Sequence, residues 1–63
     1  MPGLWIVWSW DERHELWMEV AQGGKRDMSA TLKRKRSAAA RLLPSARFAM
    51  TAAGDAPSGP PED

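Results

Sequence analysis

The chain has no cysteine and only one histidine among its 63 residues. Without thiols, neither a disulfide framework nor a thiolate zinc site can stabilise so short a fold. A domain shorter than about 70–80 residues rarely gains more than a few kcal/mol from its core. We therefore expect tryptophan-rich packing, or association with a second copy or another protein, to supply the missing stability.

Long hydrophobic segments are also missing. The apolar run that begins at Leu4 ends at Val7 or Trp8, has no Lys or Arg before it, and is soon followed by Asp11. A membrane-spanning helix needs about 20 apolar residues, and a signal peptide begins with a basic region. The sequence therefore predicts a soluble, cytoplasmic protein without a membrane segment.

Charges of opposite sign occupy different parts of the chain, whose net charge is +1. Residues 1–24 hold one cation and four acidic side chains (−3), residues 25–47 hold eight cations and one acid (+7), and residues 48–63 hold three acids (−3). This distribution can steer an anionic partner to the middle segment, although it does not determine the fold.

The most β-prone stretch is residues 4–10, which contain three of the four tryptophans. Treated as a strand, this stretch is apolar on both faces, which is typical of a central strand. One face would hold Leu4, Ile6, Trp8 and Trp10, and the other Trp5, Val7 and Ser9. We predict that the first of these faces packs against the rest of the core.

A second alternating stretch, residues 15–21, follows a polar interruption and predicts a β-hairpin. Directly opposed residues share a face, so the hydrophobic pattern selects a register. The favoured pairs are Trp10 with Leu16, Trp8 with Met18, and Ile6 with Val20. This register predicts a three-residue loop, Glu12 to His14, with His14 in the left-handed conformation.

Residues 29–43 consist mostly of strong helix formers, and Pro44 ends the predicted helix. Asp27 or Ser29 is the expected N-cap. The predicted apolar stripe contains Met28, Leu32, Ala39, Leu42 and Leu43, interrupted by Lys35. One stripe of this kind can cover only one face of a sheet.

Residues 46–51 alternate again and predict a third strand beside the first. The predicted fold is therefore an α+β domain of ββαβ order over residues 1–53, with a three-stranded antiparallel sheet of order 2-1-3 and one helix on one face. Residues 54–63 are rich in Pro, Gly and acidic side chains and should form a disordered tail.

Catalytic chemistry has little support in the sequence. Asp11, Glu12, His14 and Glu15 form a polar cluster, but a solvated turn contains the same residue types. With a single histidine and no glycine-rich phosphate loop, neither a catalytic pair nor a metal shell can be assembled. We predict a protein that is not an enzyme and that has no metal, cofactor or small-molecule substrate.

The basic residues of the helical region form the first candidate contact surface. Clustered cations release counterions from DNA or RNA on binding. Four successive helical cations nevertheless point around the whole circumference, so a solvated helix face or an import signal explains them equally well. The candidate residues are Lys25, Arg26, Lys33, Arg34, Lys35, Arg36 and Arg41.

The second candidate surface is the sheet face that the single helix leaves uncovered. Two exposed tryptophans beside aliphatic residues are typical of an interface. The alternative is that loops or the tail fold across this face. The predicted interface residues are Trp5, Val7, Trp17 and Ala49, with Ala21 beside them.

These surfaces lead to a functional hypothesis of a small interaction or regulatory module. Its expected partner is either a second copy of the chain, which would give a homodimer, or another protein. In both cases the partner binds the tryptophan-bearing face. The competing hypothesis is a nucleic-acid-binding protein that uses Lys33 to Arg36. A third alternative is an unselected reading frame that folds only in part.

Overall fold

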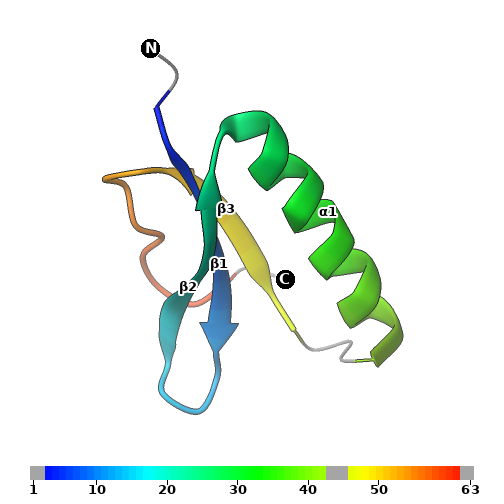
Figure 1. The fold of residues 1–63 in the computed structure, drawn as a ribbon. Coiled ribbons are helices and arrows are strands. Elements are labelled where there is room, and N and C mark those ends of the chain that lie inside the picture. The colour runs from blue at the N-terminus through cyan, green and yellow to red at the C-terminus, as the bar shows by residue number, and fades with distance from the viewer. Residues whose placement is uncertain (1–2, 43–45, 62–63) are drawn as a thin grey trace.

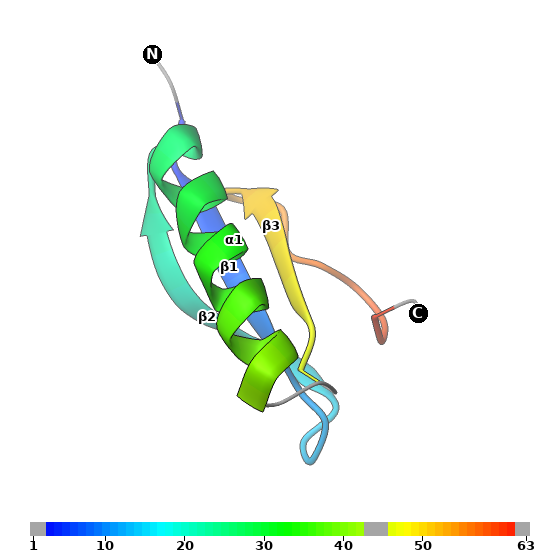
Figure 2. The same cartoon turned by 90° about the vertical axis from the view of Figure 1, so that its right-hand side faces the viewer.

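A computed structural model describes residues 3–42 and 46–61 of the chain. The elements follow the order β1 (Trp5–Asp11), β2 (Leu16–Gly23), α1 (Lys25–Leu42) and β3 (Phe48–Ala52). The three strands form one antiparallel sheet of order β2-β1-β3, and α1 packs on one face of it (Figures 1 and 2). The predicted α+β class, strand order and single helix are confirmed.

The ends of the elements differ from the prediction by a few residues. The helix begins at Lys25 instead of Ser29, so neither Asp27 nor Ser29 is its N-cap. Gly24 precedes it, and the Gly24 carbonyl accepts a hydrogen bond from the Met28 N–H at 2.9 Å. Glycine is an acceptable residue at this position, and the longer helix adds two cations to α1.

The hairpin register differs from the predicted one. The structure pairs Trp10 with Trp17 and Trp8 with Glu19, and after a β-bulge it pairs Val7 with Ala21, so that Val20 is the extra residue. The loop has four residues, and Glu15 adopts the left-handed conformation (φ 53°) in place of the predicted His14. A loop one residue longer moves every facing pair of the hairpin.

The helix covers the face of the sheet that was predicted to be open. Val7 is 0% exposed, and the Lys25 ammonium lies 5.1 Å from the centroid of the Trp5 ring. A Cβ on Gly23 would lie 3.3 Å from the terminal methyl carbon of Met28. Small residues such as Ser9 and Gly23 leave room on this face for a helix, whereas the opposite face carries three of the four indoles.

The prediction that Leu4, Ile6, Trp8 and Trp10 face the helix is therefore wrong. Trp8 is only partly buried, and its indole N–H donates a hydrogen bond to the Thr51 hydroxyl at 2.8 Å. The side of the sheet away from α1 thus carries Trp8, Trp10 and Trp17, whereas Trp5 and Phe48 lie on the side of α1.

Few described side chains are buried. The buried apolar residues are Ile6, Val7 and Met28, at 9%, 0% and 7% exposure. The predicted helical stripe is confirmed for Met28, Leu32, Lys35 and Ala39, which are buried or partly buried. Leu42 departs from it at 78% exposure, and Leu43 lies outside the described residues. The core is consequently small for a chain of this length.

After β3 the chain crosses to the other side of the sheet from α1 (Figure 1). Residues 54–61 form no helix or strand, as the sequence predicts for this tail. Within the described part of the chain, no helix is long and apolar enough to cross a membrane.

Candidate interaction surfaces

The predicted interface residues do not lie on one surface. Trp5 and Val7 are on the face that α1 covers. Trp17 is paired with Trp10, and Ala49 is paired with Trp8, which places them on the opposite face. Ala21 is paired with Val7 and belongs to the covered face. Trp5, Val7 and Ala21 therefore cannot contact the same partner as Trp17 and Ala49 in this fold.

The outer edge of β2 carries a set of exposed apolar side chains that sequence reasoning placed in the core. Leu16, Met18 and Val20 are 45%, 50% and 44% exposed. We call these three residues the β2 strip. Leu16 and Met18 are paired with Asp11 and Ser9, so they lie on the helix-bearing face but outside the area that α1 covers.

The backbone of β2 is open along the same edge. β2 is an edge strand, and Figure 2 shows no described segment beyond it. Edge strands are commonly protected by charged side chains, Pro, short length or a β-bulge. β2 is the longest strand, with eight residues, and contains no Lys, Arg or Pro, so its protection is limited to Glu19 and the bulge at Val20. An open ladder of hydrogen-bonding groups and the β2 strip therefore coincide.

Two indoles meet on the face away from α1. The Trp10 and Trp17 ring centroids lie 5.3 Å apart with an interplanar angle of 63°, an edge-to-face arrangement. The Trp17 indole N–H donates a hydrogen bond to the Gly59 carbonyl at 2.9 Å. The tail thus crosses part of the tryptophan-bearing face, which is the alternative that the sequence had left open.

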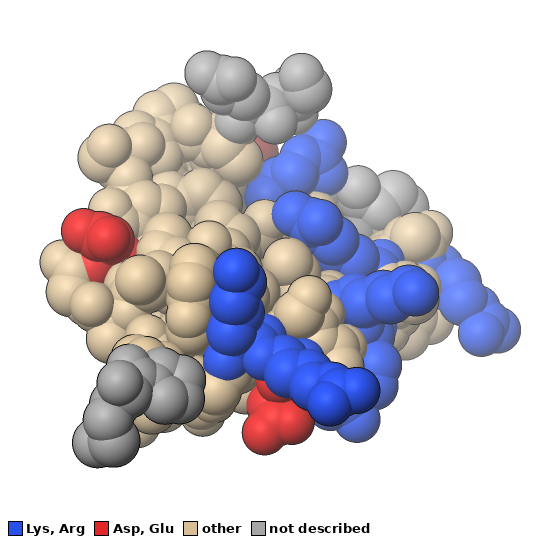
Figure 3. All heavy atoms as spheres, turned by 90° about the horizontal axis from the view of Figure 1, so that it is seen from above, with Lys and Arg blue, Asp and Glu red and all other residues tan. Residues whose placement is uncertain are grey.

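The cations of α1 form a broad surface (Figure 3). No Lys or Arg of α1 forms an ion pair with a described carboxylate. Two of the cations contact the sheet, since Lys25 lies over Trp5 and the Arg36 guanidinium donates to the Phe48 carbonyl at 3.4 Å. The Arg34 guanidinium donates to the Thr31 hydroxyl within the helix at 3.5 Å. The exposed cations that form no hydrogen bond or ion pair with any described residue outside the helix are Arg26, Lys33, Arg34 and Arg41.

Small residues lie between these cations. One shallow hollow on α1 is lined by Ser29, Ala30 and Lys33, and another by Ser37, Ala40 and Lys33. Side chains of this size let a polymer backbone approach the helix while the longer cations reach around it. The arrangement suits contact with an extended polyanion.

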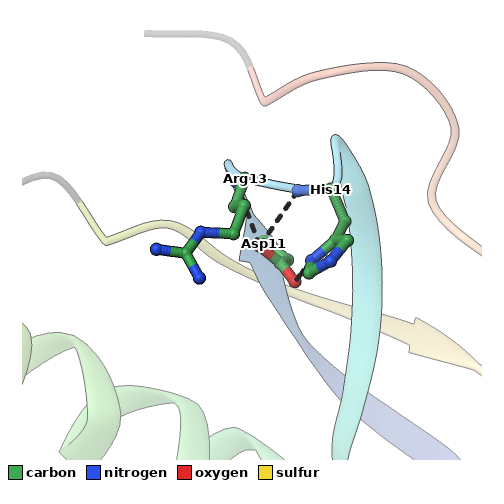
Figure 4. A network of polar contacts seen from close by, with 3 residues as sticks. All are labelled: Asp11, Arg13 and His14. Carbon is green, nitrogen blue, oxygen red and sulfur yellow. Dashed lines mark hydrogen bonds and ion pairs between the residues drawn. The ribbon is translucent and has the colours of Figure 1, made fainter.

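The polar turn of the hairpin is organised by Asp11 (Figure 4). One oxygen of its carboxylate accepts hydrogen bonds from the backbone N–H groups of Arg13 and His14, at 3.0 and 3.2 Å. Its other oxygen lies 2.7 Å from Nδ1 of His14. Among the described residues, no three side chains of the His, Asp and Glu type come close enough to hold a metal ion. In this turn the side chain of the first residue, Asp11, holds the backbone and the side chain of the residues that follow it.

The hydrogen bond from the His14 side chain is the main cause that lowers the pKa of Asp11 below its ordinary value of 3.8. The ionised carboxylate therefore stabilises the fold above that ordinary pKa, and this contribution is lost as the pH falls through the lowered pKa. We expect Asp11→Asn to lower the melting temperature slightly near pH 7. The difference from the parent should disappear in acid.

Thermal unfolding followed by circular dichroism across this pH range measures the effect. Glu12→Gln, which removes a neighbouring carboxylate from the same turn, is the control and should change the melting temperature less. A deficit of Asp11→Asn that stays constant down to strongly acidic pH would show that the charge of Asp11 is irrelevant to the turn.

Comparison of the chain with protein-family models, with curated proteins and with solved structures gives no match in any of the three. Evidence for function therefore comes from the surfaces of the fold.

Proposed function

We propose that the protein is a non-enzymatic interaction module that forms a homodimer through the edge of β2. The observation that carries this proposal is the coincidence of the β2 strip with an unpaired strand edge. An open edge is a template for pairing with another strand, and exposed apolar side chains beside it supply the hydrophobic contribution.

A second copy related by a twofold axis can pair with the open edge of β2 and cover the β2 strip at the same time. Antiparallel pairing of β2 with its copy about a twofold axis at Met18 places Met18 opposite Met18 and Leu16 opposite Val20 of the second copy. The sheet then has six strands, and the two copies of α1 lie on the same face. The apolar side chains of the β2 strip fill the space between the two helices.

The small core gives association a thermodynamic role. Only three described apolar residues are buried, whereas five large apolar residues are exposed. Each methylene group removed from water contributes about 0.8 kcal/mol. Because only the folded chain can pair in this way, the stability of the parent should rise with protein concentration.

Met18→Lys tests the proposal, since a lysine on a strand edge opposes pairing by its charge. We expect the parent to elute as a dimer in size-exclusion chromatography with light scattering at high micromolar concentration, and Met18→Lys to elute as a monomer. Leu42→Lys is the matched control because Leu42 is an exposed apolar residue on α1, away from β2. It should leave the dimer intact.

Two results would contradict the proposal. One is a parent that stays monomeric at this concentration, with a melting temperature that does not depend on concentration. The other is loss of the dimer in Leu42→Lys but not in Met18→Lys, which would move the interface to the helix.

A second candidate function is favoured by a different observation. The exposed cations of α1 have no described carboxylate partner, and small residues between them leave room for a polymer backbone. A surface of this kind supports contact with the phosphates of DNA or RNA without base recognition. The two functions are compatible, because the β2 strip and the exposed face of α1 are different surfaces.

A further inference from the structure

We propose that the Trp10–Trp17 pair, with the hollows beside it, is a docking site for an extended proline-rich segment of a partner protein. In the structure the chain's own tail, residues 57–61, occupies this site. The site goes beyond the proposed dimer and the nucleic-acid contact, since its ligand contacts the Trp10–Trp17 pair and the tail crosses the sheet on the side away from α1 (Figure 1). It shares Leu16 with the β2 strip.

The contacts of the tail identify the chemistry of the ligand. Trp17 donates its indole N–H to a backbone carbonyl, that of Gly59, at 2.9 Å. Pro57 and Pro61 are partly buried, whereas Ser58, Gly59 and Pro60 between them are exposed. The segment bends at Gly59, so its first and last prolines lie closer to the fold than the residues between them.

Aromatic surfaces suit proline for a physical reason. A proline-rich segment is extended before it binds, has no internal hydrogen bonds, and exposes its carbonyl groups. It therefore loses little conformational entropy on docking, and an indole provides both a flat apolar surface and one N–H donor. Trp10 and Trp17 provide two such surfaces set edge to face.

The tail does not fill the site. A hollow of about 440 Å³ is lined by Trp10, Glu15 and Leu16, together with residues of the tail. Another of about 450 Å³ is lined by Arg36 of α1, Arg47 and Ala49, among other residues. Both hollows also contain Trp17, Gly59 and Pro60. A partner segment with more prolines than the tail could use the space that the tail leaves.

The tail should act as a tethered competitor. A short flexible connection holds a segment near its site at an effective concentration of about millimolar. Gly59, at φ 73°, gives the tail the bend that few other residues adopt without strain. A free peptide must displace this segment, so its apparent affinity for the parent is reduced. The site is therefore partly closed until a partner supplies a better ligand.

The test uses a synthetic peptide with the sequence of residues 56–61, titrated into full-length protein and followed through the indole N–H resonances in ¹⁵N NMR. Two proteins are compared, the parent and a tail variant of unchanged length with Pro57→Ser, Pro60→Ser and Pro61→Ser. We expect the Trp17 resonance to differ between the two free proteins. The peptide should bind the tail variant on the order of tenfold more tightly than the parent.

Two matched controls define specificity. A peptide whose three prolines are replaced by alanine should not bind. Trp17→Phe, introduced into the tail variant, retains a ring but removes the donor and should weaken binding, whereas Trp5→Phe makes the same change on the opposite face and should not. The inference is overturned if the proline peptide shifts no Trp17 resonance, if it binds parent and tail variant equally, or if the alanine peptide binds as well.

Discussion

Val7→Asp is expected to leave the chain without a cooperative unfolding transition. Val7 is the one described side chain that is both large and completely buried, between α1 and the central strand. A carboxylate at this position has no described polar partner, and burying a charge without a partner costs several kcal/mol. A fold of this size has only a few kcal/mol of stability in total. The variant should therefore be unfolded at every temperature.

Leu4→Asp is the matched control because it places the same charge on an apolar residue that is 53% exposed, just before β1 and outside the β2 strip. Circular dichroism at low micromolar concentration should show a cooperative melt for Leu4→Asp and none for Val7→Asp. If Val7→Asp melts cooperatively near the parent temperature, the placement of α1 on this face of the sheet is wrong.

The second large effect is the response of polyanion binding to salt. Four cations of α1 are exposed and form no hydrogen bond or ion pair with the described part of the chain outside the helix, namely Arg26, Lys33, Arg34 and Arg41. If each contacts one phosphate of duplex DNA, the slope of log K against log salt is about −3.6. The affinity should then fall roughly 150-fold between about 50 and 200 mM salt and should be independent of base sequence.

Replacing Lys33, Arg34 and Arg41 by glutamine should reduce that slope to about −0.9, with the fold retained. Fluorescence anisotropy of a labelled duplex over a salt series measures both slopes. Arg13→Gln, which removes an exposed cation from the hairpin turn, is the control and should leave the slope unchanged. Absence of duplex binding by the parent at low salt would remove nucleic-acid contact as a function.

The two proposed functions reinforce each other through symmetry. Pairing of two β2 edges brings two copies of α1 to one face of the extended sheet. Each copy contributes seven cations against one acidic residue in α1. The dimer would therefore present a basic surface twice as large as that of the monomer, and a duplex long enough to contact both helices would show a steeper dependence on salt.

The order of the elements could be predicted from sequence because each element has a distinct pattern. Alternation in residues 4–10, 15–21 and 46–51 predicts strands, and the strong helix formers between them predict a crossover helix. A short chain with this order has few ways to pair its strands. The strand order β2-β1-β3 can therefore be predicted without knowledge of the register or of the face that the helix covers.

The register and the faces depend on details that alternation does not contain. The hairpin loop has four residues, and within it the Asp11 carboxylate accepts hydrogen bonds from the N–H groups of Arg13 and His14. The bulge at Val20 then shifts the strand pairing by one more residue. Two faces of β1 were apolar, so the pattern could not show which one α1 covers. The size of the side chains was the better guide, since Ser9 and Gly23 leave space for a helix.

The candidate site was predicted only in part for the same reasons. The cations of α1 are visible in the sequence, and most of them are exposed as expected. The β2 strip was missed because the helix was expected to cover a whole face of the sheet. Leu16 and Met18 do lie on the helix-bearing face, but α1 leaves the β2 edge of that face uncovered. The contact between Trp17 and Gly59 joins residues 42 positions apart and has no local pattern that could predict it.

The most direct test of the proposed dimer is an isotope-filtered NOE experiment on an equimolar mixture of labelled and unlabelled protein. Nuclei of two copies give such signals only when they lie within a few ångströms of each other. Pairing about an axis at Met18 predicts NOEs between the Met18 methyl groups of the two copies, and between Leu16 of one copy and Val20 of the other. A mixture at millimolar concentration that gives no NOE between copies, or that gives them only from α1, would contradict the account.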